Sequence, residues 1–137
     1  MDTTALRSLV DDHHKGVLVT LKRDGRPQLS NIAYAVVDDV IRISVTDSRA
    51  KTANLRRDPR ASLHVTRDDF WAYAVVEGTA SLTPVATDPH DATVDSLVDY
   101  FQRVNGDHDD WDEYRRAMVD DARLLVELPI EHIYGMA

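Results

Sequence analysis

Residues 16–29 read Gly-Val-Leu-Val-Thr-Leu-Lys-Arg-Asp-Gly-Arg-Pro-Gln-Leu, and this stretch decides the fold class. The run from Gly16 to Leu21 is apolar and rich in β-branched residues, which favours a strand. Asp24-Gly25 is a strong signal for a tight hairpin turn. The pattern then predicts a returning strand over residues 27–37, a turn, and a third strand over residues 40–45. The first 45 residues therefore predict an antiparallel meander.

Helical patterns lie on both sides of this meander. Leu6, Leu9 and Val10 fall on one face of a helix predicted over residues 1–15. Ser48 is predicted to cap a helix that begins near Arg49. This helix is expected to stop at Asp58-Pro59, because proline cannot extend the hydrogen-bond ladder. The remaining patterns predict strands over residues 61–67, 71–81, 124–128 and 132–134, and helices over residues 84–105 and 110–120.

The order of these elements predicts the architecture. Short strands separated by turns, with helices appended, are typical of a small antiparallel barrel or sandwich. The chain has 137 residues and shows no repeat, linker or low-complexity tract. We therefore expect residues 1–137 to form a single domain of the mainly β class with appended helices (α+β).

Composition excludes several classes of protein. The chain carries 16 basic and 24 acidic residues, a net charge of −8, which argues against general nucleic-acid binding. It contains no cysteine, so disulfides, thiolate metal sites and cysteine nucleophiles are excluded. No stretch is long and apolar enough for a membrane span or a signal-peptide core. We expect a cytoplasmic protein with no membrane contact.

One short segment departs from this acidic average. Residues 49–60 contain five basic residues and a single acid, Asp58. A helix face in water explains such a run most simply. The alternative is an anion site, since Arg49, Lys51 and Asn54 are spaced to reach one side of a strand-to-helix junction. With Ser44 and Thr46 at the end of the preceding strand, they would form a cradle for a phosphate.

Other kinds of catalytic site find little support. The six histidines include no pair at the helical i, i+4 spacing of a zinc site. No serine stands in a Gly-x-Ser-x-Gly elbow. The dense carboxylates of residues 107–113 are more typical of a solvated loop than of a catalytic pair. We therefore expect no metal.

Three blocks in order resemble a known family. Residues 16–20 and 24–31 are similar to the opening of flavin/deazaflavin split-barrel oxidoreductases. Residues 49–60 resemble the phosphate-binding segment of that family, and residues 71–80 resemble its following strand with a Glu-Gly-x-Ala ending. The resemblance extends nearly to the C-terminus. It is strongest to the F420-dependent branch of the pyridoxamine 5′-phosphate oxidase-like superfamily, seen chiefly in actinobacteria.

The resemblance implies a fold and a set of binding residues. The expected fold is a six-stranded antiparallel split β-barrel of the FMN-binding type, which forms a homodimer with two cofactor sites between the subunits. The residues it implies are Arg49, Lys51 and Asn54 for the phosphate, Gln28, Ser30 and Asn31 for the deazaflavin ring, Trp71 and Tyr73 as a wall from the other subunit, and Ser44 and Ala50 for hydroxyl and backbone contacts. Without the resemblance, Trp71 and Tyr73 are more simply explained by packing.

The implied activity is hydride transfer from reduced F420 to a small organic electrophile. F420 carries a phosphate and a polyglutamate tail, so a basic groove in an acidic protein would serve it. Solvent or Tyr73 would supply a proton. The alternatives are an FMN enzyme of the pyridoxamine 5′-phosphate oxidase type, a non-enzymatic F420 carrier, and a β-barrel interaction module whose basic segment binds an acidic partner.

Overall fold

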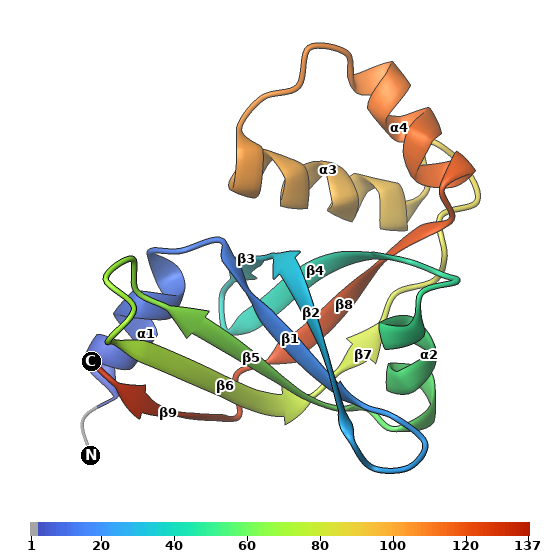
Figure 1. Cartoon of the computed structure of the whole chain (residues 1–137). Helices are drawn as coiled ribbons and strands as arrows, with labels where there is room; N and C mark the ends of the chain where they lie inside the picture. The colour runs from blue at the N-terminus through green and yellow to red at the C-terminus, as the bar shows by residue number, and fades with distance from the viewer. Residues whose placement is uncertain (1–2) are drawn as a thin grey trace.

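The computed structural model describes residues 3–137, which fold into two antiparallel sheets with four helices (Figure 1). The helices are α1 (Thr4–Asp11), α2 (Ala50–Arg57), α3 (Ala92–Asn105) and α4 (Trp111–Asp120). The strands are β1 (Lys15–Leu21), β2 (Pro27–Ala33), β3 (Ala35–Val37), β4 (Val40–Thr46), β5 (Arg60–Thr66), β6 (Tyr73–Thr79), β7 (Ser81–Leu82), β8 (Arg123–Pro129) and β9 (His132–Met136). One sheet has the order β2-β1-β5-β6-β9 and the other β3-β4-β8-β7. The mainly β class with appended helices is confirmed, but the predicted count of six strands is wrong.

The strand predicted over residues 27–37 is broken at Tyr34. The first part, β2, pairs with β1 in the five-stranded sheet, and the second, β3, pairs with β4 in the four-stranded sheet. At the break, the Tyr34 amide donates a hydrogen bond to the His14 carbonyl, and its hydroxyl donates to the Val10 carbonyl at 2.6 Å. The chain thus crosses from one sheet to the other around a buried side chain, and the predicted continuous meander is wrong at this point.

Two further predictions are corrected by local geometry. The strand predicted over residues 71–81 divides into β6 and β7, because the Ala80 amide turns away to the Pro59 carbonyl. Trp71 lies in the turn between β5 and β6, where its amide donates to Asp69 and Phe70 has a positive φ of 77°. At the start of α2 the N-cap is Arg49 and not Ser48, and no side chain caps the helix. The end of α2 before Pro59 is as predicted.

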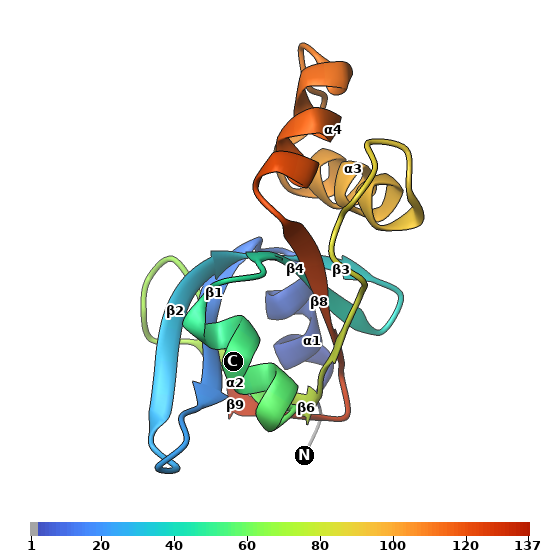
Figure 2. The same cartoon turned by 90° about the vertical axis from the view of Figure 1, so that its right-hand side faces the viewer.

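The main core lies between the two sheets. Alternate residues of the strands point inward, so that Leu18, Ile41, Leu63 and Val126 are fully buried. Helix α1 packs against β5, β6 and β9 and adds its apolar stripe to this core (Figure 2). The opposite faces of β1, β5, β6 and β9 are left outside the barrel.

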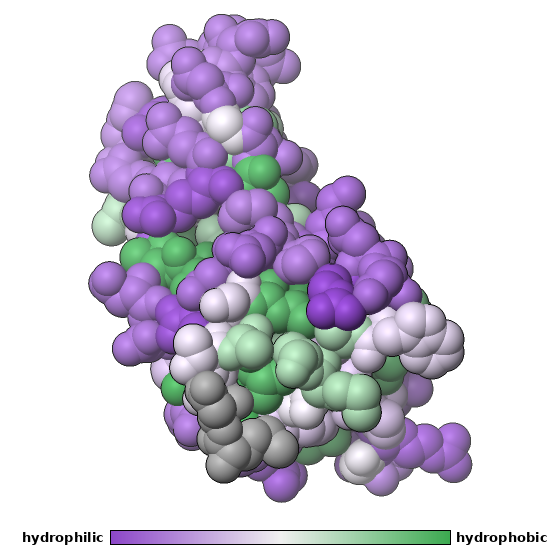
Figure 3. All heavy atoms as spheres, turned by 90° about the vertical axis from the view of Figure 1, so that its left-hand side faces the viewer, coloured by the Kyte–Doolittle hydropathy of each residue, from purple (hydrophilic) through white to green (hydrophobic). Residues whose placement is uncertain are grey.

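A second, smaller core joins α3 and α4 to the outer side of β4 and β8. Val94, Leu97 and Tyr114 pack there against Leu125. The Tyr100 hydroxyl donates to the Ala33 carbonyl at 2.9 Å, which ties this helical lobe to the end of β2. Figure 3 shows the lobe as mostly hydrophilic at its surface, whereas apolar residues gather lower, over the barrel. None of the helices in residues 3–137 is long and apolar enough to cross a membrane.

We predict that Tyr34 makes the protein sensitive to alkali. Burial raises the pKa of the Tyr34 hydroxyl far above its usual value, and the charges of Asp11 and Asp12 raise it further. A raised folded-state pKa contributes stability that is complete below the unfolded-state pKa of about 10 and is lost as pH rises above it. Burial likewise raises the pKa of Tyr114 to about 12, so part of this loss remains without Tyr34.

The test is urea unfolding of the wild type and of Tyr34→Phe at pH 8 and at pH 10.5. At pH 8 the variant is expected to lose about 1–2 kcal/mol, because the Val10 carbonyl loses its short hydrogen bond and keeps only the His13 amide at 3.5 Å. At pH 10.5 the difference between the two proteins should shrink. Tyr134→Phe removes a hydroxyl that has no hydrogen bond within residues 3–137 and keeps the apolar ring, so it is the matched control and should follow the wild type. A constant difference at both pH values would contradict the assignment.

Candidate functional site

The basic segment of residues 49–60 divides into paired and unpaired side chains. Arg56 forms an ion pair with Asp47 at 2.6 Å, and Arg60 forms one with Asp58 at 2.8 Å. Arg57 donates to the Leu21 carbonyl and to the Asn54 side chain, so it ties α2 to β1. These three arginines hold local structure. Arg49 and Lys51, by contrast, have no carboxylate partner within the described part of the chain.

Arg49 and Lys51 line a cavity of about 340 Å³, here named the basic pocket. It forms where the end of β4 leads into α2, and where β2 and β8 approach the same point (Figure 1). The lining residues are Asn31, Ile32, Ala33, Ser44, Val45, Thr46, Arg49, Lys51 and Arg123. The structure thus brings together four of the residues predicted for cofactor binding, Asn31, Ser44, Arg49 and Lys51.

Arg123 is the member that sequence reasoning missed. It lies far along the chain from Lys51, and the pairing of β4 with β8 places it opposite Thr46. Its Nε atom is buried and has no hydrogen-bond partner, and its Nη1 reaches the Ser44 hydroxyl only at 3.5 Å. In the sequence its only signal is a lone basic residue at the start of a predicted strand, which does not mark a site.

The basic pocket is electrostatically unbalanced. Burial lowers the pKa of Lys51, and the positive charges of Arg49 and Arg123 lower it further. No carboxylate lines the pocket. The first amides of α2 also lack intrahelical acceptors, as at the start of any helix, and add positive potential. Three cations close enough to disfavour one another form a site suited to an anion with several oxygen atoms.

Asn54 and Gln28 lie outside the basic pocket and bond to each other. The Asn54 amide donates to Gln28 Oε1 at 2.6 Å and to Thr20 Oγ1 at 3.2 Å, while its oxygen accepts from Arg57. The structure therefore does not bring Asn54 to the side of Lys51, and the side chain joins α2 to β1 and β2. Ser30 and Ala50 also line none of the cavities described for this chain; Ser30 is half-buried and Ala50 is exposed.

Trp71 and Tyr73 lie in a different cavity, on the outer face of the five-stranded sheet. This aromatic pocket, of about 320 Å³, is lined by His64, Thr66, Phe70, Trp71, Tyr73 and Met136. A third cavity, the bridging pocket of about 470 Å³, is lined by Lys15, Gly16, Val17, Asn31, Ile32, Ala33, His64 and Thr66. It shares residues 31–33 with the basic pocket and His64 with the aromatic pocket. Six of the ten predicted residues, Asn31, Ser44, Arg49, Lys51, Trp71 and Tyr73, therefore line three cavities that share lining residues.

The same outer face is apolar and exposed. The large apolar side chains that project from it or from its edges are Leu29, Phe70, Trp71, Tyr134 and Met136, with exposed fractions from 42% to 74%. Val17, Val19 and Val75 lie between them around a cavity of about 420 Å³. Contiguous apolar surface of this kind marks an interaction site.

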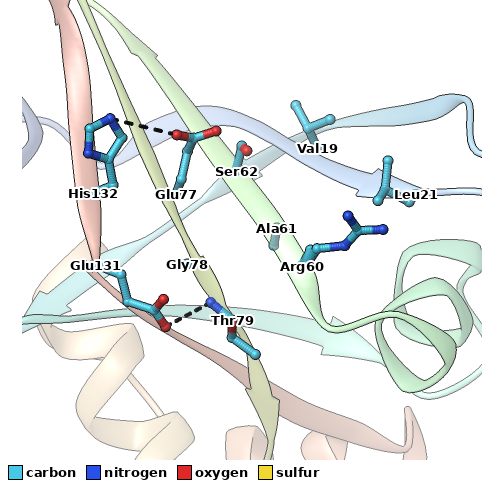
Figure 4. Close-up of a pocket in the computed structure, with 10 residues that line it drawn as sticks. All are labelled: Val19, Leu21, Arg60, Ala61, Ser62, Glu77, Gly78, Thr79, Glu131 and His132. Carbon is cyan, nitrogen blue, oxygen red and sulfur yellow. Dashed lines mark hydrogen bonds and ion pairs between the residues drawn. The ribbon is translucent and has the colours of Figure 1, made fainter.

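The far end of this sheet face holds a cavity of about 370 Å³ lined by groups of both signs of charge (Figure 4). Glu77 faces His132 at 3.9 Å, and Glu131 accepts a hydrogen bond from the Thr79 amide. The arginine beside them, Arg60, is paired with Asp58. Unlike the basic pocket, this cavity has both charges present, and residues 3–137 contain no cluster of side chains that could hold a metal ion.

Comparisons with solved structures agree on the fold. A protein described as an F420 reductase is 23% identical, with a TM-score of 0.70 over 93% of this chain and 94% of that one. A conserved hypothetical protein from Mycobacterium tuberculosis is 25% identical, with a TM-score of 0.74 over 99% of this chain and 84% of that one. A heme binding protein from Mycobacterium smegmatis is 19% identical, with a TM-score of 0.70 over 96% of this chain and 52% of that one.

The comparison with protein families is more specific. The family model described as pyridoxamine 5′-phosphate oxidase matches residues 2–137, which is nearly the whole chain. The two antiparallel sheets and the appended helices agree with the split barrel of that family. The chain therefore belongs to the pyridoxamine 5′-phosphate oxidase family.

Proposed function

We propose that this protein is an F420-dependent oxidoreductase that reduces a small organic electrophile, and that the basic pocket holds the cofactor phosphate. The observation that carries the proposal is the charge imbalance of the pocket. Arg49, Lys51 and Arg123 meet there without a carboxylate, and the buried Arg123 Nε has no acceptor. Flavin-type cofactors, which the family binds, carry a phosphate that would supply the missing acceptors.

Different residues of the basic pocket would contact different parts of the cofactor. Arg49, Lys51 and Arg123 would contact the phosphate oxygens, and the Ser44 hydroxyl and the first amides of α2 would complete the set. Asn31 lines both the basic and the bridging pocket, so it would lie where the cofactor leaves the phosphate site. Bound F420 supplies the hydride, and the protein binds and orients the ring and excludes water from it.

The proposed roles of Gln28 and Ser30 at the ring stand on the family resemblance. Both lie on β2, beside Asn31 along the chain, but their side chains alternate to the other face of that strand. The Gln28 oxygen already accepts from Asn54. Contact with the ring would therefore need a change in that hydrogen bond.

We further propose a homodimer that buries the outer face of the five-stranded sheet. The supporting observation is the set of exposed apolar side chains on that face. Because Trp71 and Tyr73 border this face and not the basic pocket, they would reach the cofactor of the other subunit. The cytoplasmic location and the small-molecule substrate remain parts of this proposal that come from the sequence.

Fluorescence titration tests which cofactor the protein binds. Trp111→Phe removes the tryptophan of the helical lobe and leaves Trp71, at the aromatic pocket, as the reporter. We expect saturable quenching by F420, weaker quenching by FMN, and competition by inorganic phosphate. Turnover of reduced F420 with a panel of electrophiles then checks the activity.

The outcomes separate the alternatives. Tighter binding of FMN than of F420 would favour an FMN-dependent oxidase-like enzyme. Binding of F420 without turnover would favour a carrier. Binding of neither would contradict both oxidoreductase interpretations and favour an interaction module.

A further inference from the structure

His64 occupies the centre of the outer sheet face. It lies on β5, between two residues, Leu63 and Val65, that are fully buried on the barrel side. Side chains alternate along a strand, so His64 projects from the barrel. Its strand neighbours in register are Val17 on β1 and Val75 on β6. The imidazole thus lies between two valines across the sheet, with Ser62 and Thr66 beside it along β5.

The imidazole is held in place from two sides. Its ring stacks on Tyr73, with centroids 5.5 Å apart and an interplanar angle of 27°. Its Nδ1 faces the Thr66 hydroxyl at 3.4 Å. When the hydroxyl donates to Nδ1, the proton of the neutral ring is on Nε2. No residue in the described part of the chain accepts from that Nε2.

Four of the other five histidines use their ring nitrogens within the described part of the chain, and the fifth, His90, is exposed to solvent. Hydrogen bonds or ion pairs to backbone groups or carboxylates are made by His13, His14, His108 and His132. His64 differs because no carboxylate lines any of the three cavities that it borders, and Lys15 is the one charged residue there. With the Thr66 hydroxyl as donor to Nδ1, the Nε2–H of His64 is a donor without an acceptor in the described chain, and such a group is suited to a polar atom of a ligand.

Shared lining residues relate His64 to the basic pocket. His64 borders the bridging pocket, which shares residues 31–33 with the basic pocket, and it also borders the aromatic pocket. We propose that His64 is a ligand-contacting residue whose Nε2 donates a hydrogen bond to an oxygen or nitrogen atom at the edge of the planar heteroaromatic ring anchored by its phosphate in the basic pocket. This inference rests on the proposed function.

His64 is placed to contact a ring bound by its own subunit or a ring bound by the partner subunit. A ring bound to the same subunit would extend from the basic pocket into the bridging pocket. A ring bound to the partner would face the aromatic pocket. His64 borders both cavities, and Tyr73 keeps its imidazole at their junction.

Binding measurements with His64→Phe test the contact, because this substitution removes both ring nitrogens and keeps an aromatic ring beside Tyr73. Affinities for F420, for FMN and for inorganic phosphate are compared with those of the wild type by calorimetry. Loss of one hydrogen bond is expected to weaken binding of the ring-bearing cofactor by about 5- to 10-fold. Inorganic phosphate fills only the basic pocket, so its affinity should stay unchanged. His132→Phe, on the same sheet face but paired with Glu77, is the matched control.

A spectroscopic readout does not depend on the variant. In long-range ¹H–¹⁵N spectra of the wild-type imidazoles, F420 or FMN should shift the Nε2 resonance of His64, whereas phosphate should leave it in place. The missing signals of His64→Phe assign the resonance. If that variant fails to fold, the wild-type spectra still decide, with assignment by backbone-to-side-chain correlation.

The two proposals fail in different ways. If neither cofactor binds the wild type, both are overturned. If a cofactor binds, but with equal affinity to His64→Phe and without moving the His64 resonance, the contact is overturned while the cofactor assignment stands. An equal loss of phosphate and cofactor affinity in His64→Phe would also overturn the contact, because it would show an effect on the basic pocket or the fold.

Discussion

Replacing Lys51 or Arg123 by alanine is expected to weaken cofactor binding by about 10- to 100-fold, and replacing both should abolish it at micromolar concentrations. Each side chain would lose a charge-assisted hydrogen bond to phosphate, worth about 1.5–3 kcal/mol. Both residues line the basic pocket, and neither has a carboxylate partner within residues 3–137. Affinities for F420 and FMN measured by calorimetry check the prediction.

The melting temperature of the Lys51 variant distinguishes a binding role of this residue from a structural one. Burial and two nearby arginines lower the pKa of Lys51, so its charge is disfavoured in the free protein. Lys51→Ala should therefore leave the melting temperature of the free protein unchanged or raise it slightly. Inorganic phosphate at high concentration should raise the melting temperature of the wild type by mass action, but not that of the double variant.

Arg60→Ala is the control from the same basic segment. Arg60 is exposed and paired with Asp58, outside the basic pocket, so this variant should bind cofactor like the wild type. Unchanged cofactor affinity in Lys51→Ala would show that the phosphate assignment is wrong. Equal losses in Lys51→Ala and Arg60→Ala would indicate a general charge effect and not a site.

Leu29→Asp is expected to convert the proposed dimer into a monomer. Leu29 is 62% exposed and borders the apolar cavity on the outer sheet face together with Val17 and Tyr134. In a dimer that buries this face, an aspartate would be an unpaired charge in an apolar interface, at a cost of several kcal/mol. Size-exclusion chromatography with light scattering should give twice the chain mass for the wild type and once that mass for the variant.

The same variant reports on where the cofactor lies. If Trp71 and Tyr73 act from the partner subunit, Leu29→Asp should also weaken F420 binding while leaving inorganic phosphate binding intact. Arg116→Asp, on the exposed side of α4, alters the charge of the helical lobe and should stay dimeric. A monomeric wild type, or a dimeric Leu29→Asp protein, would contradict the proposed interface.

Local patterns predicted most of the elements but not how strands are grouped into sheets. The hairpin at Asp24-Gly25 and the end of α2 before Pro59 depend on neighbouring residues, and both occur as predicted. The break at Tyr34 does not depend on neighbouring residues. It arises because one side chain enters the core and bonds to the Val10 carbonyl. A continuous run of strand-forming residues carries no mark of such a crossing.

In the candidate site, too, some features follow from local sequence and others only from tertiary contacts. The basic composition of residues 49–60 is visible in the sequence, and it points to an anion near the start of a helix. Which of its bases are free is not visible, since Arg56, Arg57 and Arg60 take partners from positions that depend on side-chain packing. The spacing of Asn54 suggested a place beside Lys51, whereas its bonds to Gln28 and Thr20 hold it elsewhere.

The sequence by itself therefore determined the mainly β class, the local elements and the segment in which an anion site would begin. These follow from rules that act over a few residues, namely side-chain periodicity, turn chemistry and helix termination. Only the tertiary structure brought Arg123 opposite Thr46, left Arg49 and Lys51 without a carboxylate partner among residues 3–137, and set His64 at the edge of three cavities. Strand pairing and burial decide such contacts, because they join residues that are far apart along the chain and that no local pattern relates.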